Sequence, residues 1–268
     1  MLKLGKDVRV HPTARIDVED GFVGDRSVIC ANAVIEGRYI RIGHEAWIDE
    51  YSYIGGGSCH DPWSSLVAGD FLHMGRFSHL NPGRGLAIGH EFGCGINTKI
   101  FTHGSYESAW DGFPVQWGPV NIGDRVWMPN AWVNPNVRVG NDVIVAAMSL
   151  VSKDLPDGCL AGGIPCKVLK EKVYPRILSA SEKKELFERI FSESTVIHGA
   201  RRGGSGASPH SFETIDEDVY AIAGATFDLR KRVIEGQVSE FSEILKNQLR
   251  RNGIRFRYFA KGATYEKW

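Results

Sequence analysis

VNIGDRVWMPNAWVNPNVRVGNDVIVAAMSLVSK, residues 120–153, returns to an apolar side chain at close to every sixth position. The recurring residues are Ile122, Met128, Val133, Val139, Val145 and Val151. A period of six matches neither a helix nor a single strand, so each hexad is interpreted as one short strand and a turn. Three hexads then make one coil. Because inward residues would stack on their equivalents in the next coil, the pattern predicts a core shaped as a column.

The same spacing extends toward the N-terminus. It runs through Val10, Ile16, Phe22, Val28 and Val34 and, after a slip, through Ile42, Ile48 and Ile54. Glycine is frequent, at 31 residues, and often follows an inward aliphatic side chain, as in Ile42-Gly43. Tight corners favour a residue that tolerates positive φ, and this is the role expected for these glycines. Two segments, near 55–72 and 104–119, break the rhythm and are interpreted as loop excursions from the coils.

The chain is expected to have several parts. The repeat predicts a mainly β domain over residues 1–172. The segment 173–198 is expected to be helical, because Ser181–Phe191 has the cap, charge and apolar spacing of a helix. Residues 199–212 are rich in glycine, serine and arginine, which predicts a flexible linker. Residues 213–268 predict a small α/β appendage, with a hairpin, an amphipathic helix carrying Phe241 and Leu245, and a final strand.

Composition gives no support for a nucleic-acid-binding or membrane-bound protein. The formal net charge of the 268 residues is +0, so charge gives no argument for binding nucleic acid or a membrane surface. The start, MLKLGKDVRV, lacks the apolar stretch of a signal peptide, and no apolar run is long enough for a transmembrane segment. We therefore expect a cytoplasmic protein. The five cysteines are scattered without a CxxC pair, which favours reduced thiols over disulfides or a zinc site.

The strings from Val120 to Gly158 and AGGIPCKVLK, residues 161–170, resemble the last coils and closing segment of the hexapeptide-repeat acyltransferases. The branch that they resemble contains the maltose, galactoside and xenobiotic acetyltransferases. The resemblance implies a left-handed parallel β-helix that forms homotrimers, with each acyl-CoA site between two subunits. One departure is a coil, MPNAWVNPNVRV, that is one residue short and has Pro129 where glycine is common.

His103 is the candidate catalytic residue. Acyl transfer to a hydroxyl or amine needs a base that removes the acceptor's proton, and histidine serves this role near neutral pH. His103, in IFTHGS, is placed similarly to the family's catalytic histidine. We expect a nearby carboxylate, Glu107 or Asp111, to orient its imidazole.

The resemblance also implies a site for acetyl-CoA, the acyl donor, with no metal. Trp127 resembles the aromatic residue beside the pantetheine arm. Small-residue or main-chain contacts fall at Asn130, Ala147, Ser152 and Ala161, and the phosphate-facing cations at Lys153, Lys167 and Lys170. Each of these taken alone also fits a structural or solvated position.

The acceptor side is less defined. His73, His79, Asn81 and Arg84 lie in the region where related enzymes hold a sugar hydroxyl, and they are the candidate acceptor contacts. A γ-carbonic-anhydrase-like metal protein is an alternative, because His73 and His79 are one rung apart and could share a face. An inactive scaffold is another.

The sequence therefore predicts a CoA-dependent acyltransferase. The expected reaction is direct transfer of acetyl from acetyl-CoA to a hydroxyl of a sugar or glycan, with a histidine general base. N-acetylation of a nucleotide-linked amino sugar and acetylation of a xenobiotic are the alternatives within the same fold.

Overall fold

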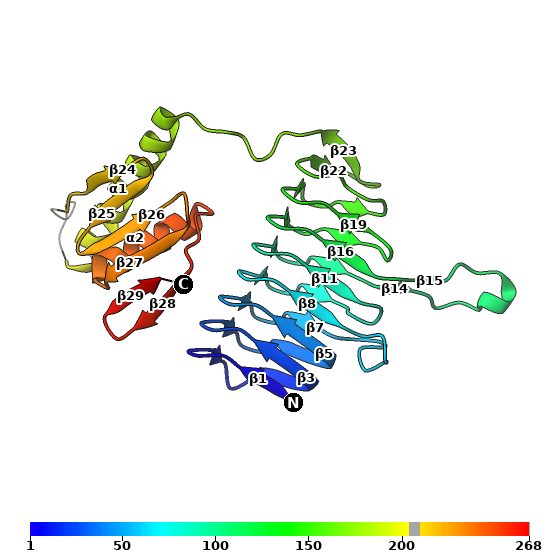
Figure 1. Ribbon diagram of the computed structural model, residues 1–268. Helices are drawn as coiled ribbons and strands as arrows, with labels where there is room; N and C mark the ends of the chain where they lie inside the picture. The colour runs from blue at the N-terminus through cyan, green and yellow to red at the C-terminus, as the bar shows by residue number, and fades with distance from the viewer. Residues whose placement is uncertain (204–209, 268) are drawn as a thin grey trace. The chain divides into compact units, whose positions relative to one another are not determined.

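The computed structural model describes residues 1–203 and 210–267, which form two compact units, Met1–Arg176 and Ile177–Trp268. Part of the predicted linker, residues 204–209, lies outside the described residues. The first unit consists of short parallel strands in stacked coils (Figure 1). No helix within the described residues combines the length and hydropathy needed to cross a bilayer.

Apart from one antiparallel ribbon of residues 103–117, the strands of the first unit lie in three rows that the chain visits in turn. The first row contains β2 (Arg9–Val10), β4 (Val28–Ile29), β6 (Trp47–Ile48), β9 (His73–Met74), β12 (Gly93–Cys94), β17 (Trp127–Met128), β20 (Ile144–Val145), β22 (Leu160–Gly162) and the antiparallel β23 (Lys167–Lys170). The second contains β7 (Tyr53–Ile54), β10 (His79–Leu80), β13 (Lys99–Ile100), β18 (Trp132–Val133) and β21 (Leu150–Val151). The third contains β1 (Leu2–Leu4), β8 (Leu66–Ala68), β11 (Leu86–Ile88), β16 (Val120–Ile122) and β19 (Arg138–Val139).

Two long strands, β3 (Arg15–Val23) and β5 (Val34–Ile42), each span the second and third rows. They correct the predicted register of the first coils. The buried positions there are Val23, Ile29 and Ile35, one residue later than the predicted Phe22, Val28 and Val34. The reason is that a long strand turns the corner between rows without a break and takes up one additional residue.

The core is a set of stacked columns. Ile35, Ile54, Leu80, Ile100, Val133 and Val151 form the column under the second row, each 0% exposed. The six predicted inward residues of 120–153 are all buried, at 4% exposure or less. Four of the five cysteines are buried as free thiols, and Cys30 is partly buried.

Glycines at the corner before the first row have a different role from the one predicted. Gly24 and Gly43 do not have positive φ, whereas Arg26 and Glu45, two residues further along, do. A Cβ on Gly24 would lie 2.5 Å from the carbonyl carbon of Gly43 in the next coil. Glycine is required here because successive backbones approach closely.

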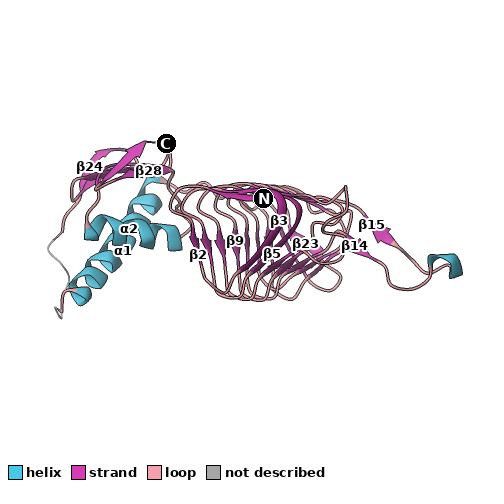
Figure 2. Cartoon of the chain, turned by 90° about the horizontal axis from the view of Figure 1, so that it is seen from below, coloured by secondary structure: helices cyan, strands magenta, loops and turns pink. Residues whose placement is uncertain are grey.

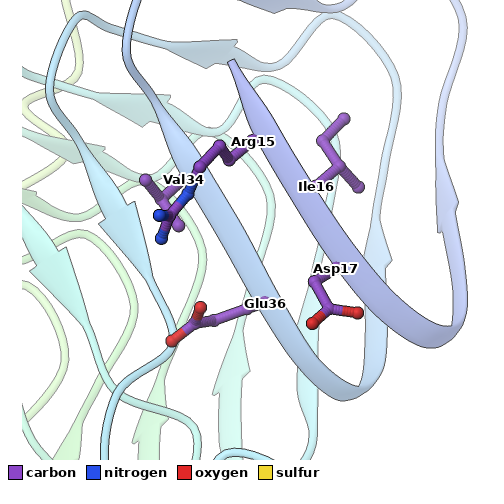
Figure 3. A pocket seen from close by; sticks show the side chains of 5 residues that line it. All are labelled: Arg15, Ile16, Asp17, Val34 and Glu36. Carbon is purple, nitrogen blue, oxygen red and sulfur yellow. The ribbon is translucent and has the colours of Figure 1, made fainter. Parts of the chain in front are cut away.

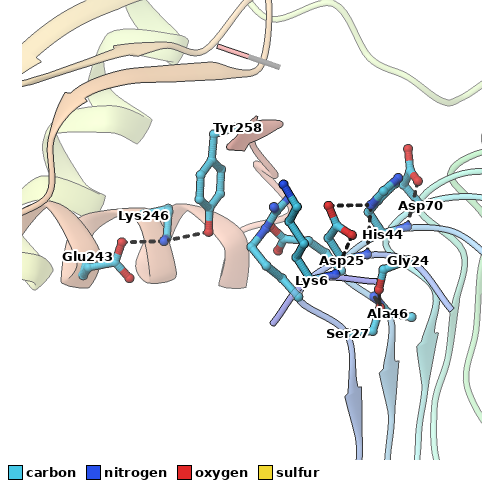
Figure 4. A network of polar contacts seen from close by, with 12 residues as sticks. Lys6, Gly24, Asp25, Ser27, His44, Ala46, Asp70, Glu243, Lys246 and Tyr258 are labelled. Atoms are coloured by element: carbon cyan, nitrogen blue, oxygen red, sulfur yellow. Dashed lines mark hydrogen bonds and ion pairs between the residues drawn. The ribbon is translucent and has the colours of Figure 1, made fainter. Parts of the chain in front are cut away.

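A ladder of side chains reinforces this corner (Figure 4). The backbone N–H of Lys6 donates to Asp25 Oδ1 at 2.8 Å, that of Asp25 to His44 Nδ1 at 2.9 Å, and that of His44 to Asp70 Oδ1 at 2.9 Å. The pattern continues through His90. Each side chain thereby satisfies a backbone donor of the preceding coil that the strands leave unpaired.

The second unit is a six-stranded antiparallel sheet with two helices on one face (Figure 2). Its elements are α1 (Ala180–Arg201), β24 (Glu213–Asp216), β25 (Val219–Ile222), β26 (Ala225–Asp228), β27 (Val233–Gln237), α2 (Glu240–Arg251), β28 (Tyr258–Lys261) and β29 (Thr264–Lys267). A capping box of Ser179 and Glu182 begins α1. The helix begins at Ala180, inside the predicted helical segment, and ends at Arg201, three residues beyond the predicted end at 198.

Candidate active site

His103 lies where the chain leaves the second row. It begins β14 (His103–Gly104), which pairs with β15 (Gln116–Trp117) to form an antiparallel ribbon that projects from the coils, with the short helix η1 (Ala109–Asp111) near its end (Figure 1). His103 is directly opposite Trp117 in this ribbon, and the two rings stack with centroids 5.1 Å apart. The ribbon thus fixes the plane of the imidazole.

Asn81 is the centre of the hydrogen bonding around this histidine. The side chain is fully buried, and its Nδ2 donates to Gly55 O at 3.0 Å and Gly57 O at 3.1 Å. Its Oδ1 accepts from Gly83 N at 3.0 Å and from Thr102 Oγ1 at 3.1 Å. If the amide were flipped, Oδ1 of Asn81 would face the carbonyl oxygens of Gly55 and Gly57, which cannot donate. The hydrogen bonds therefore assign the orientation of the amide.

The orientation of Asn81 assigns the tautomer of His103. Nδ1 of His103 is 3.1 Å from Asn81 Oδ1, which can only accept, so Nδ1 carries the proton. Nε2 therefore holds the lone pair. A Cβ on Gly57 would lie 3.6 Å from Nε2, so the Gly57 backbone borders the atom where a proton would be taken.

The surroundings of His103 favour its neutral form. Burial lowers the pKa of the imidazole below its usual value, and the cation of Arg84 lowers this pKa further. Arg84 is held between two tryptophan rings, with Cζ 4.7 Å from the centroid of Trp63 and 4.4 Å from that of Trp117. Its NH1 lies 3.7 Å from Asp61 Oδ2. A neutral imidazole is the form that acts as a base.

Aromatic rings continue along the second row from this site. Tyr53 stacks on His79 at 4.5 Å, His79 meets Phe101 edge-on at 4.9 Å, and Phe101 stacks on Trp132 at 5.2 Å. The Nε2 of His79 is occupied by the Gly55 carbonyl at 3.1 Å. Since a carbonyl only accepts, Nε2 of His79 carries a proton, and the ring packs as part of this aromatic surface.

The structure brings three of the four predicted acceptor residues to His103: His79, Asn81 and Arg84. It places His73 elsewhere, on β9 in the first row, in register with Trp47 and Gly93. The expectation that His73 and His79 share one face is wrong, because consecutive hexads lie on different rows of the coil. No group of metal-ligating side chains is found among residues 1–203 and 210–267.

The predicted orienting carboxylates do not meet the imidazole. Glu107 and Asp111 are exposed in the ribbon beyond β14, where Asp111 belongs to η1 and its backbone N–H donates to Ser108. The partner of Nδ1 is the Asn81 amide. The physical reason is that the ribbon carries residues 105–115 away from the coils, whereas Asn81 lies one coil away from Phe101.

The predicted CoA residues fall in several places. Ser152 and Lys153 are exposed just after β21, in the row that carries Asn81 and Phe101. Asn130 and the exposed Ala147 lie at the corner between the first and second rows. Trp127, 43% exposed, lies on the first row, where its ring covers Gly93. Lys167 and Lys170 are exposed on β23.

Ala161, predicted as a small-residue or main-chain contact with CoA, lies in the core. Its side chain is fully buried in the core column of the first row, and its carbonyl accepts from Ala146 N at 2.8 Å. The methyl group is thus a core contact.

Several residues around His103 were not predicted. They are Trp63, Trp117, Phe101, Gly57 and Asp61. They are hard to find from the sequence, because Trp63 and Trp117 belong to different excursions, and both rings contact Arg84. The aromatic content of both loops was the available signal, and it is typical of loops that cover a site.

No family model matches the chain. It is 25% identical over 175 residues to galactoside O-acetyltransferase of Escherichia coli, which covers 61% of this chain and 76% of that protein. It is 30% identical over 113 residues to the putative colanic acid biosynthesis acetyltransferase WcaF of Escherichia coli, covering 42% of this chain and 61% of that one. A galactoside acetyltransferase structure in complex with coenzyme A has a TM-score of 0.41 at 22% identity, covering 50% and 64% of the two chains.

These relatives are named as acetyltransferases, the class of enzyme that the motifs of the chain resemble. The chain spans three quarters of the galactoside enzyme and less than two thirds of WcaF.

Proposed function

We propose that this protein transfers an acetyl group from acetyl-CoA to a hydroxyl group of a sugar or glycan, with His103 as the general base. The observation that carries the proposal is the contact between Asn81 Oδ1 and His103 Nδ1 at 3.1 Å, which leaves the Nε2 lone pair beside Gly57. The motifs shared with the acetyltransferases and the relationship to galactoside O-acetyltransferase support the donor and the acceptor class.

The chemistry follows from that geometry. Nε2 removes the proton of the acceptor hydroxyl as its oxygen attacks the thioester carbonyl carbon. The tetrahedral intermediate collapses, the C–S bond breaks, and the CoA thiolate takes the proton back from the imidazolium. Asn81 can accept from Nδ1–H throughout, so it stabilises the imidazolium without taking part in proton transfer. Burial and Arg84 lower the pKa of His103, which favours the neutral form of the proposed base.

The coils are proposed to wind as a closed left-handed β-helix over residues 1–172, with residues 213–268 as a separate appendage. The proposed assembly is a cytoplasmic homotrimer with acetyl-CoA bound between neighbouring subunits. The distribution of the predicted CoA residues supports shared sites: Ser152 and Lys153 lie on the His103 row, whereas Trp127 lies on another row. A cleft between two subunits would be lined by one face of each subunit, so CoA-binding residues are expected on two different faces of the coils.

The test is an acceptor screen that follows thiol release from acetyl-CoA. His103→Ala is expected to lower kcat on the order of 10²–10⁴-fold with the best acceptor, because the general base is lost. His11→Ala, which removes an exposed histidine of the first coils, is the matched control and should retain full turnover. Cleavage of the product by hydroxylamine distinguishes an O-ester from an N-amide. Wild-type turnover by His103→Ala would refute the proposed base.

A further inference from the structure

A cavity of about 400 Å³ opens on the first coils, away from His103. It is lined by Arg15, Ile16 and Asp17 of β3 and by Val34 and Glu36 of β5 (Figure 3). Asp17 and Glu36 are register partners on neighbouring strands, so their carboxylates lie side by side at one level of the row. None of these residues belongs to the site around His103.

The cavity and the site share one surface. In the parallel register, Arg15, Val34, Tyr53 and His79 occupy equivalent positions of successive coils. A second line of the same row runs through Asp17 and Glu36 to Gly55, Asn81 and Phe101, with backbone N–H groups of Gly55 and Asn81 bonded to the next coil. Gly55 and Asn81 are buried, so the accessible path from the cavity toward His103 follows the partly exposed Tyr53 and His79. A Cβ on Gly55 would touch the Glu36 side chain, so the two positions are adjacent.

Side-chain contacts bridge the distance between them. The Tyr53 hydroxyl donates to Glu36 Oε1. Tyr53 then stacks on His79, which meets Phe101, whose ring centroid is 6.1 Å from that of His103. Since coils are spaced by about 4.8 Å, the three steps from Glu36 to Phe101 cover about 14 Å. This is longer than one pyranose ring and suits a short chain of sugars.

The chemistry of the cavity selects the ligand. Two carboxylates accept hydrogen bonds from hydroxyl groups, and one guanidinium donates them to ring or hydroxyl oxygens. The formal charge of the lining is −1, which disfavours phosphorylated or acidic sugars. Ile16 and Val34 add a small apolar surface for the C–H face of a sugar ring.

We propose that the acceptor is an uncharged oligosaccharide that lies along the second row, with its reacting sugar at His103 and its far end in the cavity of Arg15, Asp17 and Glu36. This inference rests on the proposed function, because it places the non-reacting part of the acceptor of that same reaction. Binding at the far end holds the reacting hydroxyl at Nε2, so a longer acceptor is used more efficiently.

The test uses two acceptor series, glucose to maltotetraose and glucose to cellotetraose, with thiol release and calorimetric titration as readouts. In at least one series, kcat/KM and affinity are expected to rise at least tenfold from one sugar to three or four. Asp17→Asn and Arg15→Gln should lower this long-to-short ratio at least tenfold, mainly through KM. Asp20→Asn is the matched control, because Asp20 lies on the same strand but pairs with Arg41 outside the cavity.

The outcomes separate the two proposals. If glucose and its tetramers are turned over equally well in both series, the extended site is refuted while the acyltransferase proposal stands. The extended site is also refuted if no oligosaccharide binds, or if Asp17→Asn changes the mass measured by light scattering, since the cavity would then be a subunit contact. If His103→Ala retains full turnover, the proposed base fails whatever the acceptor length.

Discussion

Gly57→Ala tests the assignment of Nε2 as the reacting atom. The new methyl carbon would lie 3.6 Å from Nε2 and 3.7 Å from Cε1 of His103, which is ordinary van der Waals contact. A reacting hydroxyl oxygen must lie about 2.8 Å from Nε2 and stay about 3.5 Å from that carbon, so directions within roughly 65° of the methyl are closed to it. The acceptor must shift, and a misplacement of about 1 Å can cost on the order of 100-fold.

We therefore expect kcat/KM of Gly57→Ala to fall by about 10- to 100-fold in the thiol-release assay. The free energy of unfolding should stay constant or rise by about 0.4–1 kcal/mol, because φ at Gly57 is not positive and alanine restricts the unfolded chain. Gly104→Ala is the matched control: it follows His103 directly, but its Cβ would meet nothing within 4 Å. Full activity of Gly57→Ala would refute acceptor approach from this side of the imidazole.

Three further predictions concern the corner, the pH dependence and the donor. In Gly24→Ala, the new Cβ would lie 2.5 Å from the Gly43 carbonyl carbon and must move by about 0.9 Å to reach normal contact. We expect the free energy of unfolding to fall by about 2–4 kcal/mol, because two hydrogen bonds are disrupted and the corner is overpacked. Urea unfolding measures this loss, and an unchanged midpoint would contradict it. The proposed base, His103, would work in its neutral form, and burial and Arg84 lower its pKa, so the acid limb of kcat/KM should lie below the usual histidine range. Arg84→Met should move that limb to higher pH and Arg84→Lys should not, whereas identical profiles would exclude the electrostatic role. Trp127→Ala should weaken acetyl-CoA binding roughly tenfold. At a hundredfold excess over Kd, acetyl-CoA should stabilise the wild-type protein by about 2.7 kcal/mol, and the variant should show a smaller shift in thermal unfolding. Equal shifts would mean that the pantetheine arm of acetyl-CoA binds elsewhere.

The sequence predicted the columns of the core well where hexads are regular. Ile122, Met128 and Val133 are buried as expected, because a two-residue strand and a turn repeat without interruption. In the first coils the prediction was one residue out from Phe22 to Val34, because β3 turns a corner as a continuous strand, and it was right again from Ile42 to Ile54. Phe22 and Val23 are consecutive apolar residues, so hydrophobicity alone does not show which of the two points into the core.

The candidate site was predicted in part. His103 and three of the acceptor candidates lie together, because residues about one coil apart in the sequence stack on the same row. The orienting group was assigned to a carboxylate close in sequence, whereas Asn81, 22 positions away, holds that place. His73 was wrongly grouped with His79, since one hexad moves the chain to another face.

The sequence by itself determined the repeating unit, the inward apolar column, the choice of His103 as candidate base and the class of enzyme that the motifs resemble. All of these are local patterns or depend on a fixed period. The tertiary structure alone decided which tautomer His103 adopts, how Arg84 is held between Trp63 and Trp117, and that the cavity at Asp17 and Glu36 lies on the row of the candidate active site. Those features arise from contacts between coils and loops far apart in the chain, and the lengths of the intervening excursions, not any local pattern, set which residues meet.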